Sequence, residues 1–573
     1  MKITKNKILA CLIASLMILG SACTQKVRTL NTNFSENILL NQMGYASDAG
    51  KKALIRADVE TFELVDKNGK VVFEGTTGEL KHWKLSGNSV RSADFSSFEK
   101  NGEYRICIKG SEFSLPVVIN DNPYDGLANA SLKSYYYSRC GFAIEERYGG
   151  NWHWESGHPD TNVLIHSSAA SMERPEGTAI SSPGGWYDAG DYGKYIVNSS
   201  ITTFTLLLSE KLNKDFHKQQ NINIPESDNN LPDILDETLY NLKWMLTMQD
   251  PNDGGLYHKL TTKRFDGFIM PNKTSNQRYV VQKSTSAALD FAATMAAASR
   301  TFQEYNMPEL VEQMKKSAEY AWQWAINNPQ VFYIQPEDIS TGAYGDTSLV
   351  DEWFWAASEM YATTGENQYL EKVKGNYEQA ITPKWGVVNT LGIITLLTSD
   401  KRSEFPQMME DYIEYVNQLV NAEKESPYLT SLNKFAWGSN SDVANQGMLK
   451  LIAYQFTKNK SYLNSARNDL DYILGRNATG YSFVTAYGYK TPKNIHQRIS
   501  AADGIDEPVP GYLAGGPNTV VLSDCKSEDV TRSLFPAMSY VDAQCSYSTN
   551  ETAINWNAPL VFLASALQAY DNK

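Results

Sequence analysis

The sequence predicts two domains of different fold class, a small all-β sandwich followed by a large all-α domain. At 573 residues the chain is too long for one ordinary core. Residues 37–120 hold short strand-like runs separated by turn residues, whereas apolar residues recur with helical spacing from Pro123 onward. Hydrophobic residues make up 42% and charged residues 20% of the chain, which is the balance of a folded protein.

Residues 1–23 read as a targeting segment rather than as part of a domain. Its basic start consists of Lys2, Lys5 and Lys7. Residues 8–19 form an apolar run that is too short for a usual membrane span. Small residues then precede Cys23, which resembles a bacterial lipoprotein signal and predicts a lipid-anchored protein of the cell envelope. Gly20 stands where such signals usually have leucine, so simple secretion is the alternative. Residues 24–36 are polar and are expected to form a tether.

The overall composition limits the classes of molecule that this protein is expected to bind. A formal net charge of -13 argues against nucleic acid or an acidic polymer as the main partner. Aromatic residues make up 12% of the chain, with 12 Trp and 33 Tyr, which suits either carbohydrate binding or a large helical core. Four cysteines lie after the leader, and they are too scattered to indicate a disulfide framework. We expect most of them to be buried and unpaired. These four are Cys107, Cys140, Cys525 and Cys545.

The β segment is predicted from six short runs rich in β-branched and aromatic residues. These runs are 38–40, 53–55, 62–65, 71–73, 104–107 and 115–118. Turn residues separate them, as in the Asp-Lys-Asn-Gly stretch at 66–69. Several short strands over some eighty residues predict a sandwich. A domain boundary is expected at Asn122-Pro123.

The helical segment is predicted from apolar residues that share one face. In residues 231–248, for example, Leu235, Leu239 and Leu242 fall on one side of a helix. The same spacing predicts further helices around 311–322, 353–361, 463–473 and 560–570. Long loops separate these helices, and the motifs that follow lie in the loops.

The stretch from Gly184 to Tyr195 reads GGWYDAGDYGKY and is predicted to be a loop, because its glycines disfavour a regular helix. It presents two carboxylates, Asp188 and Asp191, among aromatic residues. Paired carboxylates beside flat apolar rings suit glycoside hydrolysis, in which carboxylates move protons and rings stack on sugars. The structural alternative is a turn with a core-packing aromatic cluster.

This stretch resembles the motif of glycoside hydrolase family 9, also called cellulase family E. Two more stretches resemble the patterns of the family in the same order, SFVTAYGYKTPKNIHQR at 482–498 and YVDAQCSYSTNETAINWNA at 540–558. The resemblance implies an (α/α)6-barrel catalytic domain over 123–573, with a cleft along one end of the barrel. It also implies that residues 37–120 are an immunoglobulin-like module that braces the catalytic domain.

The resemblance assigns roles to the acidic residues. It implies that Asp191 is the general base that activates water, and that Asp188 holds this water and orients Asp191. Glu551 occupies the position of the general acid, whose pKa must be raised by desolvation or nearby negative charge. Read without the resemblance, Glu551 follows Ser548 by three residues and fits a capping box. Asp542 also fits the pattern, as support for neighbouring residues.

Further residues are implied to contact the sugar. His496 and Arg498 match the His-x-Arg of the family and are expected to bond sugar hydroxyls near the cleavage point, although Gln497 replaces a second histidine. Trp437 is a candidate stacking platform, with a buried core position as the alternative. The other candidate substrate-binding residues are Trp186, Tyr195 and Tyr547.

No cofactor is expected for the chemistry, and metals are considered only for structure. The hard oxygen ligands that calcium prefers are grouped at Asp346, Ser348, Asp351 and Glu352, where a negatively charged helix start is the alternative. Some relatives bind zinc through two cysteines and two histidines. Cys140, His158 and His166 are available here, but Gly157 stands where the second cysteine is expected, so zinc is disfavoured.

Together these patterns predict an inverting endo-β-1,4-glucanase that acts as a monomer on a β-glucan. The sequence does not separate cellulose, xyloglucan and mixed-linkage glucan. Two alternatives stay open. One is an exo-acting glucosidase or glucosaminidase of the same family, and the other is a surface glycan-binding lipoprotein without catalysis. The presence of both Asp191 and Glu551 favours an enzyme.

Overall fold

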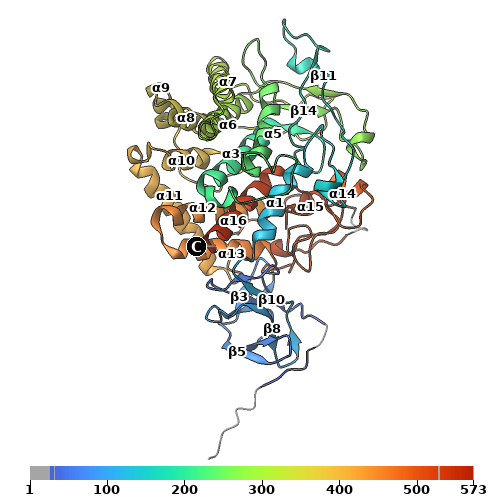
Figure 1. Ribbon diagram of the computed structural model, residues 1–573, viewed down its shortest axis with the longest axis vertical. Coiled ribbons are helices and arrows are strands. Elements are labelled where there is room, and N and C mark those ends of the chain that lie inside the picture. The colour runs from blue at the N-terminus through green and yellow to red at the C-terminus, as the bar shows by residue number, and fades with distance from the viewer. Residues whose placement is uncertain (1–25, 31–32, 527–529, 572–573) are drawn as a thin grey trace, which may run out of the picture.

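The computed structural model describes residues 26–30, 33–526 and 530–571, which form a small β domain beneath a large helical domain (Figure 1). The predicted leader and its Cys23 lie outside the described residues, so lipid anchoring stays a prediction. Within the described ranges, no helix has both the length and the hydropathy needed to cross a membrane.

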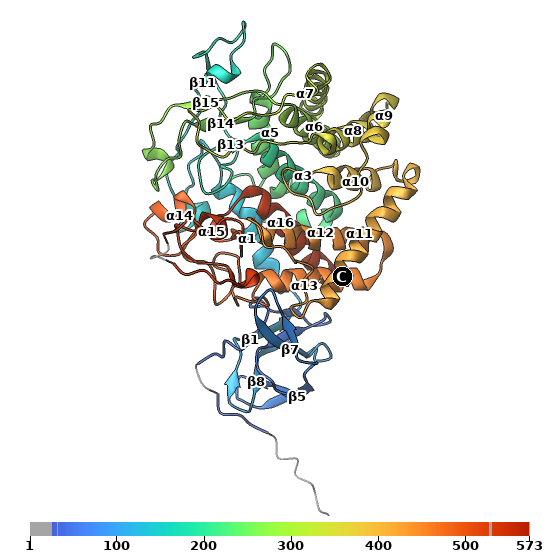
Figure 2. The same ribbon diagram turned by 180° about the vertical axis from the view of Figure 1, so that it is seen from behind.

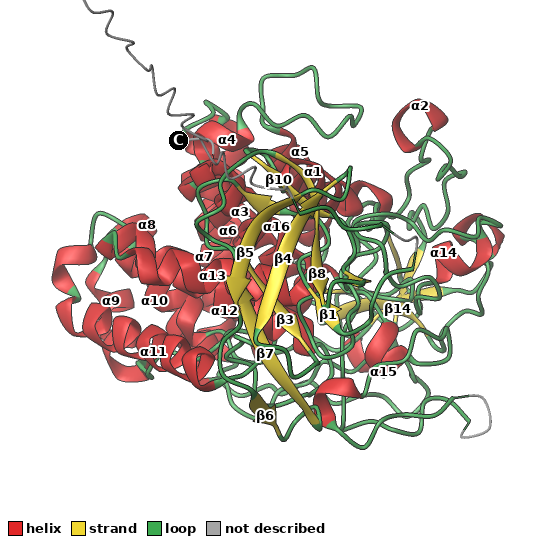
Figure 3. Cartoon of the chain, turned by 90° about the horizontal axis from the view of Figure 1, so that it is seen from below, coloured by secondary structure: helices red, strands yellow, loops and turns green. Residues whose placement is uncertain are grey.

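The small domain is a sandwich of two sheets, as predicted. The first sheet has the strand order β1 (Ile38–Leu39), β3 (Lys52–Ile55), β7 (Asn88–Asp94) and β6 (Lys81–Trp83). The second has the order β2 (Tyr45–Ala46), β10 (Val117–Asn120), β8 (Gly102–Ile108), β4 (Thr61–Asp66) and β5 (Val71–Thr76), with β9 (Glu112–Phe113) paired to β8. Apolar side chains from both sheets meet in a separate core. In Figure 3 these strands cross in front of the helices.

Each of the six predicted runs overlaps a strand, whereas β2, β6, β7 and β9 were not predicted. The segment of β7 reads NSVRSAD, and only Val90 and Ala93 in it are buried. Two small apolar residues among polar ones make too weak an alternation to be recognised as a strand. β7 forms because it pairs with β3 and β6 on its two sides.

The sandwich and the barrel share part of one core. Leu39, Leu54 and Trp83 belong to the same buried cluster as the helices of the large domain. Polar contacts add to this interface, because the Asn41 side chain donates to Oδ1 of Asp471 at 2.8 Å. The Gln42 side chain likewise donates to the backbone oxygen of Gly480. The small domain is therefore held against the barrel by both apolar packing and hydrogen bonds.

The large domain is a double ring of helices, which Figure 2 shows from behind. The inner helices are α3 (Ile196–Leu212), α6 (Thr285–Gln303), α8 (Val350–Thr364), α10 (Asn389–Leu397), α12 (Ser439–Thr457) and α16 (Ile554–Asp571). Five of them pack with the outer helix that follows in the chain, whereas the last packs with the first outer helix. These outer helices are α1 (Asp125–Tyr137), α5 (Asp233–Thr247), α7 (Pro308–Asn327), α9 (Asn367–Asn376), α11 (Pro406–Glu425) and α13 (Lys460–Ile473).

The burial of the two rings explains which helices the sequence predicted. In outer helices such as α5, α7 and α13 the apolar residues gather on one side among polar ones, so they recur with helical spacing. Inner helices such as α3 and α6 are buried on nearly all sides and show little such spacing. They went unpredicted except for α8 and α16. The remaining short helices are α2 (Glu146–Gly149), α4 (Lys214–His217), α14 (Arg498–Ala502) and α15 (Tyr547–Asn550).

A third sheet lies in the loops at one end of the barrel and supports the site. Its strand order is β12 (Ala179–Ile180), β11 (Val163–Ile165), β15 (Arg278–Val280), β14 (Lys259–Thr262) and β13 (Lys194–Tyr195). Strand β13 ends the predicted loop and runs directly into α3. The chain also makes 3-10 turns at η1 (Ser167–Ala169), η2 (Pro271–Lys273), η3 (Arg402–Glu404) and η4 (Pro536–Met538).

The cysteine prediction was right for two residues and wrong for two. Cys107 and Cys140 are buried and free. Cys525 and Cys545 form a disulfide across 20 residues. This pair was not predicted, because a long loop brings the two residues together only in the folded chain.

Candidate active site

The predicted loop forms at the N-terminal end of α3 and closes on itself. The backbone N–H of Asp188 donates to the oxygen of Gly193 at 3.0 Å. Gly185 has a φ of +76°, and a Cβ there would lie 2.7 Å from the Trp244 ring. Only glycine therefore suits this position. The turn holds Asp188 and Asp191 on one short, rigid segment.

Asp188 is buried and held by two side chains. The Asn198 amide donates to both of its carboxyl oxygens, at 2.9 and 3.0 Å, and the Tyr344 hydroxyl donates to Oδ2 at 2.9 Å. Burial, followed by the negative charge of Asp191, raises the pKa of Asp188 to about 7. Asn198 and Tyr344 were not among the predicted site residues.

Asp191 is oriented by its own loop and by Tyr195. Its Oδ2 accepts the backbone N–H of Gly193 at 2.8 Å and the Tyr195 hydroxyl at 3.3 Å. Tyr195 is fully buried, so it orients the carboxylate and offers no face to a sugar. Lys259 lies over the Tyr195 ring, and burial lowers its pKa to about 7 despite the opposing effect of Asp191.

Glu551 lies where α15 ends and faces the same loop. Its Oε1 accepts the backbone N–H of Gly190 at 3.3 Å, so the third carboxyl stands across the loop from the two aspartates. Burial, followed by the charge of Asp191, raises the pKa of Glu551 well above its usual value. This shift favours the protonated form of the carboxyl, which can donate its proton.

The segment before Glu551 is fixed by hydrogen bonds at both ends. Asp542 accepts the backbone N–H groups of Lys493 and Asn494, each at 2.8 Å, and the side-chain amide of Asn550 at 2.9 Å. This geometry fits the expected supporting role of Asp542. Asp524, beside the disulfide, accepts the backbone N–H of Ser548 at 2.9 Å.

His496 and Arg498 lie next to the acidic residues but differ in what they can contact. Nδ1 of His496 bonds the oxygen of Gln544 at 2.6 Å, which leaves Nε2 as the acceptor of a neutral ring. Burial lowers the pKa of His496 and favours that neutral form. Arg498 is buried, and it donates through Nε to the oxygen of Asp266 and through Nη1 to that of Gly190. It thus binds two backbone segments, a role that the sequence had not predicted.

The predicted aromatic residues fall into two groups. Trp437 is 44% exposed, so its ring is available to a sugar, and the half-buried Tyr547 lies beside it with the ring centres 5.3 Å apart. Trp186 is fully buried against Tyr135, and its N–H points to Glu237. The expected substrate contact of Trp186 is therefore not possible, because the ring has no exposed face.

The side chains considered for zinc are already engaged. Both ring nitrogens of His158 have partners at 2.9 Å, the hydroxyls of Tyr187 and Thr274, and burial lowers its pKa to about 3. His166 bonds Ser168 and Asp338. A Cβ at Gly157 would lie 2.2 Å from the backbone of Pro271, so the missing cysteine would not fit.

Of the predicted calcium ligands, Asp346, Asp351 and Glu352 lie near one another and Asp290 of α6 joins them, whereas Ser348 is exposed. Asp351 accepts the backbone N–H of Val388, whereas both carboxyl oxygens of buried Asp290 and one of Glu352 have no hydrogen-bond partner. Burial and mutual repulsion raise the pKa values of Asp290, Asp351 and Glu352. Among the residues that can be described, no three His, Cys, Asp or Glu side chains are arranged to hold a metal ion.

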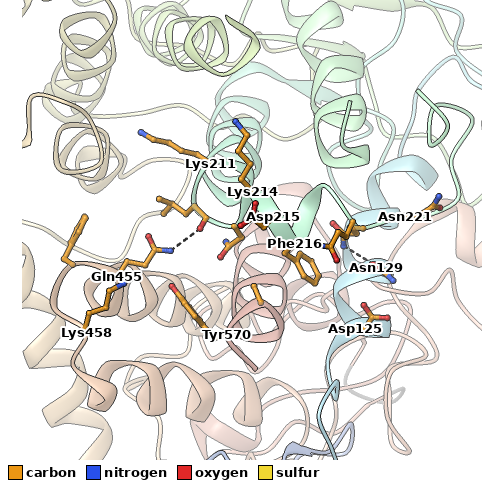
Figure 4. Close-up of a pocket in the computed structure, with 16 residues that line it drawn as sticks. Asp125, Asn129, Lys211, Lys214, Asp215, Phe216, Asn221, Gln455, Lys458 and Tyr570 are labelled. Carbon is orange, nitrogen blue, oxygen red and sulfur yellow. Dashed lines mark hydrogen bonds between the residues drawn. The ribbon is translucent and has the colours of Figure 1, made fainter. Parts of the chain in front are cut away.

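A separate hollow of about 950 Å³ lies away from these carboxyls (Figure 4). It is lined by Lys211 at the C-terminal end of α3 and by Asn129, Gln455 and Tyr570. The catalytic loop precedes the other end of α3, a helix of 17 residues that spans about 25 Å. The hollow therefore lies at the opposite end of the barrel, and none of the predicted site residues lines it.

A double ring of helices with three carboxyls in loops at one end, where burial raises the pKa of Glu551, is the arrangement of a glycoside hydrolase of the helical-barrel class. The profile of glycosyl hydrolase family 9 matches residues 124–564, and that of the cellulase N-terminal Ig-like domain matches residues 33–112. The chain belongs to glycoside hydrolase family 9, and it is a hydrolase of the endo-β-1,4-glucanase type.

Individual relatives support this assignment over nearly the whole chain. A xyloglucan-specific endo-β-1,4-glucanase from Bacteroides ovatus is 42% identical over 96% of both chains. Endoglucanase D from Acetivibrio thermocellus is 33% identical over 95% of this chain and 85% of its own. Among solved structures, a Bacteroides ovatus family 9 protein superposes with a TM-score of 0.87 at 42% identity, covering 93% of this chain and 99% of that one. A thermostable endoglucanase from Alicyclobacillus acidocaldarius reaches 0.85 at 28% identity, covering 93% and 100%.

Proposed function

We propose that this chain hydrolyses the β-1,4-linked backbone of xyloglucan with inversion, with Asp191 as general base and Glu551 as general acid. The division of roles rests on the different environments of the carboxyl groups of Glu551 and Asp191. Glu551 is buried and its pKa is raised well above the usual value, whereas Asp191 is held by a backbone N–H and a hydroxyl that both donate to it. Donated hydrogen bonds favour a carboxylate, and burial favours a protonated acid.

In this mechanism the two carboxyls act on opposite sides of the sugar. Asp191 takes a proton from a water molecule whose oxygen attacks the anomeric carbon. The bond from that carbon to the glycosidic oxygen breaks, and Glu551 gives its proton to the departing oxygen. Inverting enzymes hold the two carboxyls about 6.5–9.5 Å apart, which leaves room for the water. Asp188, held by Asn198 and Tyr344, keeps the water and Asp191 aligned.

The assignment of xyloglucan rests on the relative from Bacteroides ovatus, which is 42% identical over almost the full length. The test compares initial rates on xyloglucan, cellulose and mixed-linkage glucan. We expect the highest rate on xyloglucan, together with a rapid fall in viscosity. Equal rates on all three polymers would reject the preference, and reducing sugar released without a fall in viscosity would indicate exo action.

The catalytic roles are tested by stereochemistry and by leaving-group dependence. Proton NMR should show the α-anomer as the first product of β-glucan cleavage, and a β-anomer appearing first would mean retention. Glu551→Gln and Asp191→Ala should each lower turnover by about 10²–10⁴-fold or more. Only Glu551→Gln should recover on a substrate whose leaving group needs no proton. Binding without any hydrolysis by the wild type would instead favour a glycan-binding protein.

For location we propose a lipid-anchored monomer of the cell envelope. The basic and apolar leader that ends at Cys23 supports the anchor, and the Cys525–Cys545 disulfide suits an oxidising compartment. Wild type should carry an acyl group and enter the membrane fraction, whereas Cys23→Ala should not. A membrane-bound Cys23→Ala variant would contradict the anchor. A detergent-solubilised sample that elutes at twice the chain mass would contradict the monomer.

We also propose that the acidic group of Asp290, Asp346, Asp351 and Glu352 takes up a structural calcium ion. The unpartnered buried oxygens of Asp290 and Glu352 support this, because a hard cation would offset the repulsion between them. Binding requires the side chains to close around one point. Calcium should raise the Tm of the wild type above its value in EGTA and leave that of Glu352→Gln unchanged. If calcium does not change the wild-type Tm, protons shared between these carboxyl groups stabilise them instead of a metal ion.

A further inference from the structure

Two phenylalanines with exposed rings lie beside the catalytic loop. Phe265 and Phe268 are 47% and 39% exposed, and they belong to the segment between β14 and the 3-10 turn η2. Ile269, next to them, is 40% exposed. Three large apolar side chains within five residues form a patch of the kind that marks a binding surface.

Ring contacts and hydrogen bonds hold this aromatic segment against the catalytic loop and Arg498. The Arg498 guanidinium lies 5.3 Å from the centre of the Phe265 ring and 5.5 Å from that of Phe268. The same side chain bonds the backbone oxygens of Asp266 and Gly190. The Tyr192 hydroxyl adds a bond to the oxygen of Ile269 at 2.7 Å. The catalytic loop therefore holds both rings in place, which makes their orientation fixed before any ligand binds.

The two rings continue a row that passes the general acid. The centre of the Phe268 ring lies 5.2 Å from that of His496, and the His496 ring lies 5.8 Å from Tyr547. Tyr547 in turn stands beside the exposed Trp437. The backbone of His496 pairs with that of Glu551, so the acid lies near the middle of the row. Rings thus flank the reaction centre on both sides.

We propose that Phe265 and Phe268 form a sugar-binding platform on the side of His496 away from Trp437, where a pyranose ring of the β-glucan backbone stacks. This rests on the proposed function. The occupant is a neutral pyranose, because it offers an apolar face to the rings and hydroxyl groups to the polar groups around them. The platform would hold the chain on one side of the scissile bond while Trp437 and Tyr547 hold it on the other.

The test uses the full chain and compares Phe265→Ala, Phe268→Ala and the double variant with wild type. Loss of either ring should lower kcat/KM by about 3- to 10-fold, mainly through a higher KM. The substrates are β-glucan oligosaccharides that are long enough to span the row. The positions at which these oligosaccharides are cut should also shift, because one binding contact is lost. Phe268→Trp should retain the wild-type KM, whereas Phe268→Leu, which keeps apolar volume without a flat ring, should behave like Phe268→Ala.

Tyr320→Ala is the matched control, since Tyr320 is also 39% exposed but lies on the outer helix α7. It should leave KM and the cleavage pattern unchanged. If the wild type hydrolyses β-glucan and the double variant keeps its KM and cleavage pattern, the platform is refuted. If the variants lose kcat and shift the pH profile at unchanged KM, the rings act only by positioning Arg498 and His496, which also refutes it. A wild type without activity would refute the proposed function instead.

Discussion

Replacing Gly190 with alanine tests how closely the catalytic loop must approach the segment that carries the general acid. A Cβ at Gly190 would lie 2.1 Å from the backbone oxygen of His496 and 3.0 Å from Oε1 of Glu551. Neither neighbour is free to move, because the N–H of His496 bonds the oxygen of Asn550 and Glu551 is buried. The loop must therefore retreat by about 1 Å, a misplacement that can cost about 10²-fold in rate.

A 10²-fold loss corresponds to about 2.7 kcal/mol of transition-state stabilisation. We expect kcat/KM of Gly190→Ala on soluble β-glucan to fall by about this factor. Gly375→Ala in α9 is the control, because nothing lies within 4 Å of an added Cβ there. It should keep full activity and gain about 0.5–1 kcal/mol of stability. Activity of Gly190→Ala within threefold of wild type would refute the close approach described for this loop.

Three further predictions concern stability. Burial and Asp191 raise the folded pKa of Asp188 from 3.8 to about 7, so wild type loses stability as pH rises through this window. The unfolding free energy of Asp188→Asn relative to wild type should therefore increase by up to about 4 kcal/mol between pH 4 and pH 8, and a pH-independent difference would contradict the shift. Trp83→Ala should cost about 3–5 kcal/mol in denaturant unfolding yet preserve kcat per folded molecule, and a lower kcat at unchanged stability would overturn the bracing role. The Cys525→Ser, Cys545→Ser variant should lose about 3 kcal/mol, and dithiothreitol should reproduce this loss in wild type alone; equal stability of the two proteins would show that the bond contributes little.

Local sequence patterns predicted those site residues that lie together in one short stretch of the chain. Asp188 and Asp191 are three residues apart, and the glycines around them correctly indicated a loop. The partners of Asp188 could not be predicted in the same way. Tyr344 reaches it from 156 residues away, and no short motif contains both. Asn198 lies in the first turn of α3, where a polar residue gives no sign of its direction.

Exposure was the property that the sequence predicted least well. Trp186 and Tyr195 flank the aspartates just as a sugar-stacking residue would, yet both are buried. Phe265 and Phe268 lie outside the three motifs and are exposed. Whether a ring faces the core or the cleft depends on packing between distant segments, which composition and spacing do not encode. The same reason applies to the inner helices, whose uniform burial removes the spacing that identifies a helix.

The last inner helix, α16, determines when the active site is complete during folding. α16 packs between α3 and α12 and also against α1, and the Gln568 side chain accepts the backbone N–H of Tyr124 across 444 residues. Glu551 stands just before this helix. The catalytic loop therefore has no proton donor until Glu551 has been made, and the barrel is not closed until α16 has folded. Hydrolytic activity therefore requires two segments far apart in the chain, the loop before α3 and the segment before α16, to meet in the closed barrel.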